Sequence, residues 1–336
     1  MTLRRPLGRR PLQVVALIGA AASGCSKNDN LEPTPPPTPT GPPITSVSAI
    51  ATTSETFWSP FDGTPSPNAD KIYFTALTED SAPAVFAVDA AGGSPSKLHS
   101  GDPLEAPFSL VTSVDGGTIY VADLSADGET EVRGRIFAMP SGGGVPTSLT
   151  GSEGTRPRSL DLVQENGADV LYFTGLNDQG QPAVFRMEAS GGAATVIHAG
   201  APLSDPSGLA VATNGTIYVA DSQAAIDGSG AVVRIENGTA TVIAGEMALG
   251  FPAGIALELD GSALYVSGFQ PDKATSMVYR VTLADNAVVT FDDGIAQNIE
   301  SAGLHRAHQA NVYAWANADG KKSKPSGGAV YVLRGR

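Results

Sequence analysis

The sequence predicts an all-β fold, a six-bladed β-propeller, because one tyrosine position recurs about every fifty residues along the chain. Each of these tyrosines follows Ile, Leu or Val, and they lie 47, 52, 46, 47 and 48 residues apart. A second register with a similar period marks a later strand of each unit. The chain also holds 39 glycines and 25 prolines with only 16% charged residues, which indicates many turns and no long helices. The two registers are Tyr73, Tyr120, Tyr172, Tyr218, Tyr265 and Tyr313, and then Phe86, Phe137, Phe185, Val233, Tyr279 and Tyr331.

Each repeat unit is expected to contain four strands. In residues 205–221 a run of small and apolar residues leads into Asn214-Gly215, a dipeptide typical of tight hairpin turns, and then into a β-branched and aromatic strand. A third strand carries the second register. A fourth strand follows a glycine-rich or Asx-containing turn in five of the units, at residues 96–99, 146–149, 194–198, 240–243 and 287–290.

The sixth unit has no fourth strand of its own, because the chain stops soon after residues 329–333. Residues 45–50 form an unpaired β-type segment ahead of the first unit. We therefore expect this segment to become the outermost strand of the last blade and to close the ring, so that residues 44–336 form one propeller domain.

Residues 1–24 have the layout of an export signal: four arginines, an apolar core from Leu12 to about Ala21, and small residues leading to Cys25. The segment 22–25 resembles a bacterial lipobox, which implies that Cys25 is lipidated and becomes the first residue of the mature protein. An ordinary signal peptide with an incidental cysteine is the alternative. Cys25 is the chain's single cysteine, so no disulfide framework is possible.

Residues 25–43 are rich in proline and threonine and offer almost nothing apolar to bury. We expect an extended, disordered stalk that holds the propeller clear of a bilayer. Ser26 stands where an inner-membrane lipoprotein would carry aspartate, so the lipobox resemblance implies an outer-membrane location.

The fourth unit resembles the NHL-type propellers and the related gluconolactonase-like and TolB-like six-bladed propellers. The resemblance spans about residues 45–336 and implies the fold, but its members include lyases, lactonases and plain binding platforms, so it does not imply one function. Long segments between the second and third strands, at residues 124–134 and 222–230, depart from the compact repeat and are expected on one face. The matching residues are Pro206, Gly208, Leu209, Ala210, Gly215, Ile217, Tyr218, Val219, Ala220, Asp221, Val233, Arg234, Ile235, Thr241, Ile243, Ala244 and Gly245.

The formal net charge of −13 argues against nucleic acid as a partner, because an acidic surface repels phosphate backbones. The membrane is expected as a partner only through the lipid at Cys25. We expect a monomer.

Residues just before each inner strand would surround one mouth of the central channel, where a propeller site commonly forms. Seven residues at these positions are our candidates, because their type differs from one unit to the next. We predict ligand-binding roles for Glu55, Arg156, Arg158 and Phe251, and metal-binding roles, with Ca²⁺ as the candidate ion, for Glu105, Asp205 and Glu300. A solvated rim of weakly paired charges is the alternative.

His305 is the candidate catalytic residue, a general base near the channel, with a hydrogen-bonded packing role as the alternative. His308 lies three positions later, and residues three apart on a strand face opposite sides, which argues against a shared zinc ion. Asp123 and Asp221 are expected to accept backbone N–H groups from the loops that follow them.

The function predicted from the sequence is therefore an envelope-anchored lipoprotein whose propeller binds a protein or glycan partner, through the face that carries the channel mouth and the long loops. The alternative is a Ca²⁺-dependent hydrolase, lactonase or lyase with its site at that mouth.

Overall fold

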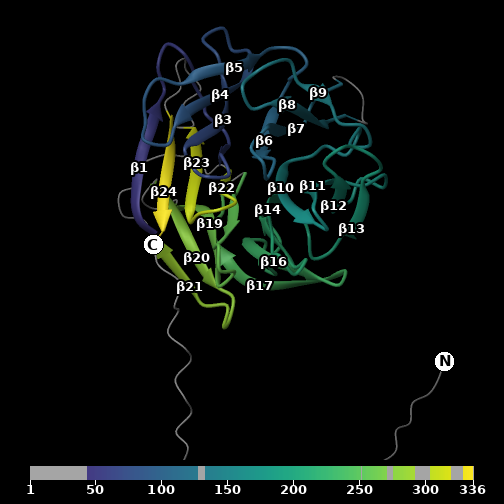
Figure 1. Cartoon of the computed structure of the whole chain (residues 1–336). Helices are drawn as coiled ribbons and strands as arrows, with labels where there is room; N and C mark the ends of the chain where they lie inside the picture. The colour runs from purple at the N-terminus through teal and green to yellow at the C-terminus, as the bar shows by residue number, and fades with distance from the viewer. Residues whose placement is uncertain are drawn as a thin grey trace, which may run out of the picture. The chain divides into compact units, whose positions relative to one another are not determined.

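The structure, a computed structural model, describes residues 44–127, 133–250, 252–270, 275–291, 303–318 and 328–335. Within these ranges the chain is all-β (Figure 1). No helix long and apolar enough to cross a membrane occurs in this part of the chain. The predicted signal, stalk and lipidation site, together with Phe251 and Glu300, lie outside the described residues.

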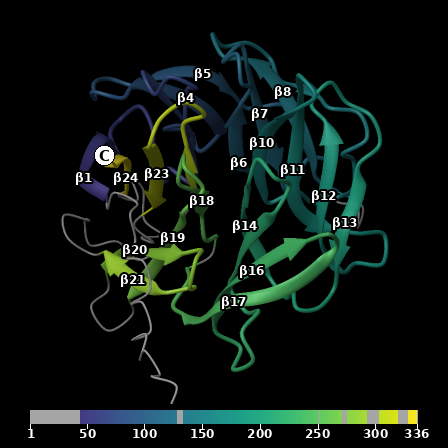
Figure 2. The ribbon, with the colours of Figure 1, turned by 60° about the horizontal axis from the view of Figure 1, so that its bottom comes forward.

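Six four-stranded antiparallel sheets form the blades of the propeller, numbered here in chain order, and Figure 2 shows them arranged around a central axis. The first three blades are β2 (Gly63–Pro65), β3 (Lys71–Leu77), β4 (Pro83–Asp89), β5 (Ser96–Ser100); β6 (Pro107–Thr112), β7 (Thr118–Asp123), β8 (Arg135–Pro140), β9 (Thr147–Ser148); and β10 (Ser159–Glu165), β11 (Ala168–Leu176), β12 (Pro182–Glu188), β13 (Thr195–Ala199). The last three are β14 (Pro206–Val211), β15 (Ile217–Asp221), β16 (Gly230–Glu236), β17 (Thr239–Met247); β18 (Ile255–Leu257), β19 (Ala263–Gln270), β20 (Thr275–Thr282), β21 (Val288–Phe291); and β22 (Leu304–Arg306), β23 (Val312–Ala318), β24 (Gly328–Gly335), β1 (Ile44–Thr52).

The predicted ring closure is confirmed. β1 pairs antiparallel with β24, with Ile44 opposite Gly335 and Thr52 opposite Ala329, so the last blade contains both ends of the domain. Ile50 on β1 is buried among side chains of blade 1. The first strand therefore completes blade 6 and also packs against its neighbour.

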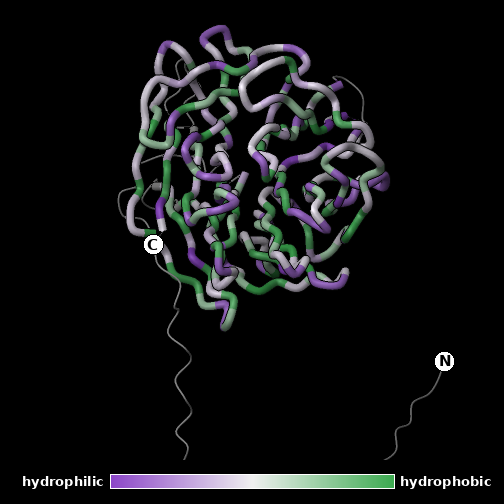
Figure 3. Tube along the Cα trace, in the orientation of Figure 1, coloured by the Kyte–Doolittle hydropathy of each residue, from purple (hydrophilic) through white to green (hydrophobic). Residues whose placement is uncertain are grey.

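The hydrophobic core is divided into clusters that lie between neighbouring blades rather than inside one central mass. Alternating strand residues face the two adjacent blades, because successive side chains of a strand point to opposite sides of the sheet. Figure 3 shows apolar stretches along the strands and hydrophilic stretches in the peripheral turns. All six repeat tyrosines are buried in these clusters, so the regular spacing in the sequence is the spacing of a packing position.

Candidate functional site

Two cavities lie along the ring axis. We call the side where the inner strands begin the start face, and the side where they lead into hairpin turns the turn face. The start-face cavity, beside Arg158 and Ser159, has a volume of about 10 Å³, room for roughly one water molecule. The turn-face cavity has a volume of about 710 Å³, within the range of small-molecule sites. The wide cavity therefore lies at the face opposite the predicted binding face.

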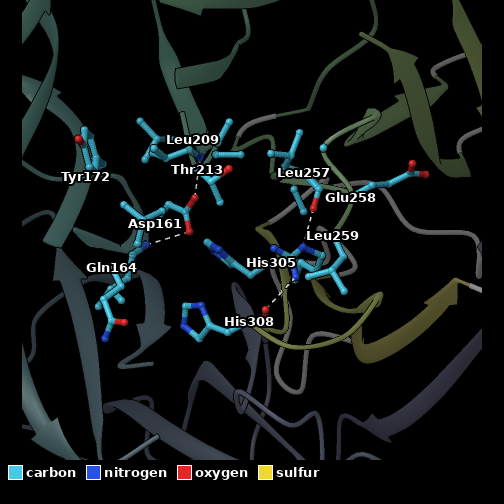
Figure 4. Close-up of a pocket in the computed structure, with 18 of the residues that line it drawn as sticks. Asp161, Gln164, Tyr172, Leu209, Thr213, Leu257, Glu258, Leu259, His305 and His308 are labelled. Carbon is cyan, nitrogen blue, oxygen red and sulfur yellow. Dashed lines mark hydrogen bonds between the residues drawn. The ribbon is translucent and has the colours of Figure 1, made fainter. Parts of the chain in front are cut away.

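The turn-face cavity is built from the ends of three inner strands and from the segment after the sixth (Figure 4). Asp161 and Gln164 come from β10, Thr213 and Asn214 from the turn that follows β14, and His308 from the segment after β22. Their side chains supply hydrogen-bond donors and acceptors from different directions. Because these residues differ from blade to blade, the site is asymmetric although the ring is built from repeats.

His305 separates the two cavities, since its side chain lines both. It is 7% exposed, and its Nε2 lies 3.0 Å from Oδ2 of Asp62. Burial by itself would lower the pKa of His305, but the charge and hydrogen bond of Asp62 and the charge of Asp161 outweigh it, and the pKa is raised. The contact with the buried Asp62 carboxylate therefore favours the protonated form of His305.

Asp62 joins three blades at this point. Its Oδ1 accepts the Gly63 N–H at 2.8 Å within blade 1, and its Oδ2 accepts the Leu110 N–H at 2.8 Å from blade 2. The same Oδ2 carries the contact to His305 of blade 6. A buried carboxylate with backbone and imidazole partners is satisfied, so the contact between Asp62 and His305 ties blades 1, 2 and 6 together beneath the cavity that His305 lines.

Ser109, His305 and Asp62 are the residue types of a catalytic triad but do not have its geometry. The Ser109 Oγ lies 3.3 Å from Nε2 of His305, the same nitrogen that contacts Asp62. A triad requires the serine and the carboxylate on different ring nitrogens, so that one orients the base that serves the other. Ser109 is also buried and accepts the Leu160 N–H at 3.3 Å. This trio therefore supplies no activated nucleophile.

Asp161 lines the turn-face cavity together with His305 and His308. Its oxygens accept the backbone N–H groups of Leu162 at 2.8 Å and Val211 at 2.7 Å. Burial raises the pKa of Asp161, against the lowering effect of these bonds and of the charges of His305 and His308. Asp161 is therefore an acceptor fixed by two blades and aimed at the cavity that the histidines also line.

His308 lines the same cavity as His305, whereas the strand alternation predicted opposite faces. The alternation does not apply because β22 ends at Arg306, before His308 is reached. The Nε2 of His308 donates to the Thr112 carbonyl of blade 2 at 2.9 Å. Among the described residues, no three His, Cys, Asp or Glu side chains converge closely enough to hold a metal ion.

Two further carboxylates of the cavity wall are neutralised by arginines. Glu165 accepts Arg186 at 2.7 Å and the Tyr172 hydroxyl at 2.6 Å. Burial and the bond to Glu165 raise the pKa of Tyr172 to about 12. Glu258 accepts two N–H groups of Arg280 at 3.0 Å each. These two carboxylates are thus paired, whereas Arg306, which also lines the cavity, donates to the carbonyls of residues 257, 307 and 308.

The candidate residues predicted on the start face differ in exposure and in their partners. Arg158 forms an ion pair with Asp205, and Asp205 also accepts the Ser222 hydroxyl at 2.7 Å. Glu105 and Glu55 are exposed. The Asp205 carboxylate is thus already engaged by Arg158 and Ser222. Glu300, the third residue of the predicted Ca²⁺ set, lies outside the described residues, so the set stays a prediction and we derive no chemistry through calcium.

The structural role expected of the two repeat aspartates is confirmed. Asp123 accepts backbone N–H groups of residues 105, 106, 125 and 126, at 2.8 to 3.0 Å. Asp221 accepts those of residues 204, 205 and 223, at 2.8 to 3.0 Å. Each aspartate fastens the start of an inner strand to the loop that leaves the second strand.

Sequence reasoning missed Asp62, Asp161 and His308 as members of the site. A signal for Asp161 is present in the register: the inner-strand residue opposite the repeat tyrosine is Thr64, Val111, Asp161, Ala210, Ala256 and Arg306. Charge replaces a small or apolar residue in blades 3 and 6 only. One position earlier, His305 takes the place of Leu110, Leu160, Leu209 and Ile255.

No protein-family model and no curated protein matches this chain. Solved structures with the same fold include a PQQ-bound aldose sugar dehydrogenase from Streptomyces coelicolor, at 15% identity and a TM-score of 0.58 over 87% of this chain and 99% of that one. A gluconolactonase from Xanthomonas campestris aligns at 14% identity and a TM-score of 0.57, over 88% and 95%. TolB from Acinetobacter baumannii aligns at 13% and 0.54, over 71% and 56%. At these identities the likeness shows the six-bladed propeller fold alone.

Proposed function

We propose that this protein is an exported, lipid-anchored binding module that holds a neutral, hydroxyl-rich ligand, a glycan, in its turn-face cavity. The observation that carries the proposal is the 710 Å³ cavity with fixed donors and acceptors. Sugar hydroxyls both donate and accept, so they suit a wall that contains a carboxylate, amides, a hydroxyl and imidazoles together.

Charged residues of both signs, among them Arg306 and Asp161, line the wall, so it favours a neutral ligand over one that carries a single sign of charge. Glu165 and Glu258 are paired with arginines, and His305 is paired with Asp62. Asp161 remains as an acceptor, which would repel a negatively charged group placed beside it. Binding rather than catalysis is favoured because the serine beside His305 lacks triad geometry and is buried.

The binding test uses the fragment 44–336 with a panel of neutral oligosaccharides. A ligand at a hundred times its dissociation constant should add about 2.7 kcal/mol of stability, a rise in Tm of roughly 5–10 °C for a domain of this size. Gln164→Trp would fill the cavity from an exposed wall position and should abolish the rise. Gln179→Trp, at an exposed turn that does not line the cavity, is the matched control and should keep it.

The proposal fails if none of the neutral oligosaccharides raises the Tm, or if the two tryptophan variants respond equally. A response to small organic cations instead would assign the cavity, through Asp161, to a different ligand class.

The anchoring part of the proposal rests on the sequence of residues 1–25. Metabolic labelling with palmitate should mark the wild-type chain and leave Cys25→Ser unlabelled. Labelling of both chains, or of neither, would contradict it.

A further inference from the structure

Three arginines gather on the start face, between blades 2 and 3. The Arg156 N–H donates to the Arg133 carbonyl at 3.2 Å, and the Arg158 N–H donates to the carbonyl of Thr174 on β11 at 2.9 Å. A third bond, from the N–H of Gly154 to the carbonyl of the residue after Arg133, is 2.9 Å long. The segment that carries the arginines is therefore fixed by backbone bonds on both sides.

The positive charge of this cluster is only partly compensated. Arg158 is paired with Asp205, but Arg133 and Arg156 form no ion pair with any described residue. The Nε of Arg156 is buried without a hydrogen-bond partner in the described structure. Buried donors normally have partners, so this guanidinium is set up for an acceptor that the described residues do not provide.

The three charges are close enough to act on one another. Burial lowers the pKa of Arg156, and the neighbouring charges of Arg133 and Arg158 lower it further. Arginine nevertheless stays protonated in proteins, so the repulsion persists in the folded state. In a chain with a net charge of −13, this is a local positive site on an acidic protein.

The backbone of the cluster is in an unusual conformation at Arg156. Arg156 has φ of 49°, in the left-handed region that non-glycine residues seldom occupy. Opposite it, Gly134 allows a close approach, since a Cβ there would stand 2.8 Å from the Arg156 Cα. Strain of this kind tends to persist where a side chain is held for a purpose.

We propose that Arg133, Arg156 and Arg158 form a binding site for an oxyanion, the carboxylate, phosphate or sulfate group of a small ligand. Guanidinium groups present planar pairs of N–H donors that match the oxygens of such groups. Arg158 borders the small start-face cavity, on the other side of His305 from the turn-face cavity. The site is thus separate from the proposed glycan site and stands or falls independently.

The experiment measures binding of inorganic phosphate, inorganic sulfate and glucuronate to the fragment 44–336 at constant ionic strength, with chloride as the reference salt and glucose as the uncharged partner of glucuronate. Sulfate and phosphate stabilise most proteins by exclusion from the surface, so the informative quantity is the difference between wild type and variants. Calorimetry supplies the dissociation constants.

Arg156→Gly is the principal variant, because glycine adopts the left-handed conformation freely and the fold should be kept or strengthened. Its affinity for the anions should fall at least about tenfold, as expected for the loss of one charged hydrogen-bonding partner. Arg133→Gln should show a loss of the same order. Arg234→Gln, a lone arginine on β16 outside the cluster, is the matched control and should bind as wild type does.

Equal anion affinities in wild type, Arg156→Gly and Arg133→Gln would overturn the proposal. A preference for glucuronate would assign the site to a carboxylate ligand, and a preference for phosphate or sulfate to a tetrahedral oxyanion. Glu129 and Glu131 precede the cluster outside the described residues. If anions bind only after both are changed to glutamine, the native chain has no such site and the proposal is wrong.

Discussion

The N-terminal strand β1 should hold the propeller ring closed, and its removal is the sharpest test of the fold. A fragment that starts at Thr53 loses the strand partner of β24 together with two isoleucines, Ile44 and Ile50, that are only 4% and 8% exposed. Burial of an isoleucine side chain stabilises a protein by about 1.5–3 kcal/mol, so these two contribute roughly 3–6 kcal/mol. Domains of this kind are stable by only about 5–15 kcal/mol.

Urea denaturation of fragments 44–336 and 53–336 measures the effect. In fragments that also carry Trp58→Phe, fluorescence comes from Trp315 alone and reports blade 6, since this tryptophan is fully buried on β23. Far-UV circular dichroism reports all blades. We expect the midpoint to fall sharply by both probes together. Ile50→Ala should cost about 2–4 kcal/mol, while Ser48→Ala, at an exposed position on the same strand, should cost almost nothing.

A difference below about 1 kcal/mol between the unfolding free energies of the two fragments would refute a ring-closing role for β1. So would a separate early transition of Trp315 with the circular dichroism unchanged, because blade 6 would then melt by itself. A synthetic peptide of residues 44–52 should restore part of the lost stability in a concentration-dependent way, as any ligand of the native state does.

Four other variants test individual contacts within the ring. His305→Gln should be most destabilising, relative to wild type, at low pH. Because the pKa of His305 is raised, its pairing with Asp62 contributes fully below the ordinary pKa of about 6.5 and is lost as the pH rises through the folded-state pKa. A Tm difference between the variant and wild type that does not shrink between pH 5.5 and 9 would contradict this. Asp221→Asn should cost about 3 kcal/mol in urea titrations, because three backbone N–H groups lose a charged acceptor; a cost within error of zero would show that the loop needs no such fastening. Glu258→Gln should cost about 3 kcal/mol and Glu165→Gln less than about 1, since the first carboxylate is 1% exposed and the second 32%; equal losses would contradict the role given to burial.

Much of the fold was predictable because the repeat tyrosines report a physical position. A large side chain on the second strand packs between blades, so its spacing counts the blades directly. The missing fourth strand of the last unit and the unpaired segment before the first then predicted the pairing of β1 with β24. These inferences need only the period and the number of strands, which a sequence displays.

The site was less predictable, because it depends on distances across the axis. Periodicity places His305 on an inner strand but does not reveal that Asp62, 243 residues earlier, meets it. Strand alternation predicted that His308 faces away from His305, but β22 ends at Arg306, so the alternation does not extend to His308. The volume of each cavity follows from how six different inner strands fill the axis, so the repeat does not predict at which face the channel widens.

Arg156 and Arg158 illustrate the middle case. Their place at the start of an inner strand made them candidates, and the structure brings Arg133 beside them through a backbone bond between neighbouring blades. The pairing of Arg158 with Asp205 could not be read from the sequence, since 47 residues separate them. In the described structure Arg158 is therefore ion-paired with Asp205, whereas Arg133 and Arg156 have no ion pair with a described residue.

The pairing of Ile44 with Gly335 also bears on how the chain could be rewired. The two ends of the described domain are neighbours across one strand pair, so a short loop from the last residue to the first would turn β24 and β1 into an ordinary hairpin. The chain could then be opened at a connection between two blades, such as the one between β5 and β6, and every blade would be built from consecutive sequence. In such a circular permutant the ring would no longer depend on its own ends finding each other, and ring closure would become a local event in folding.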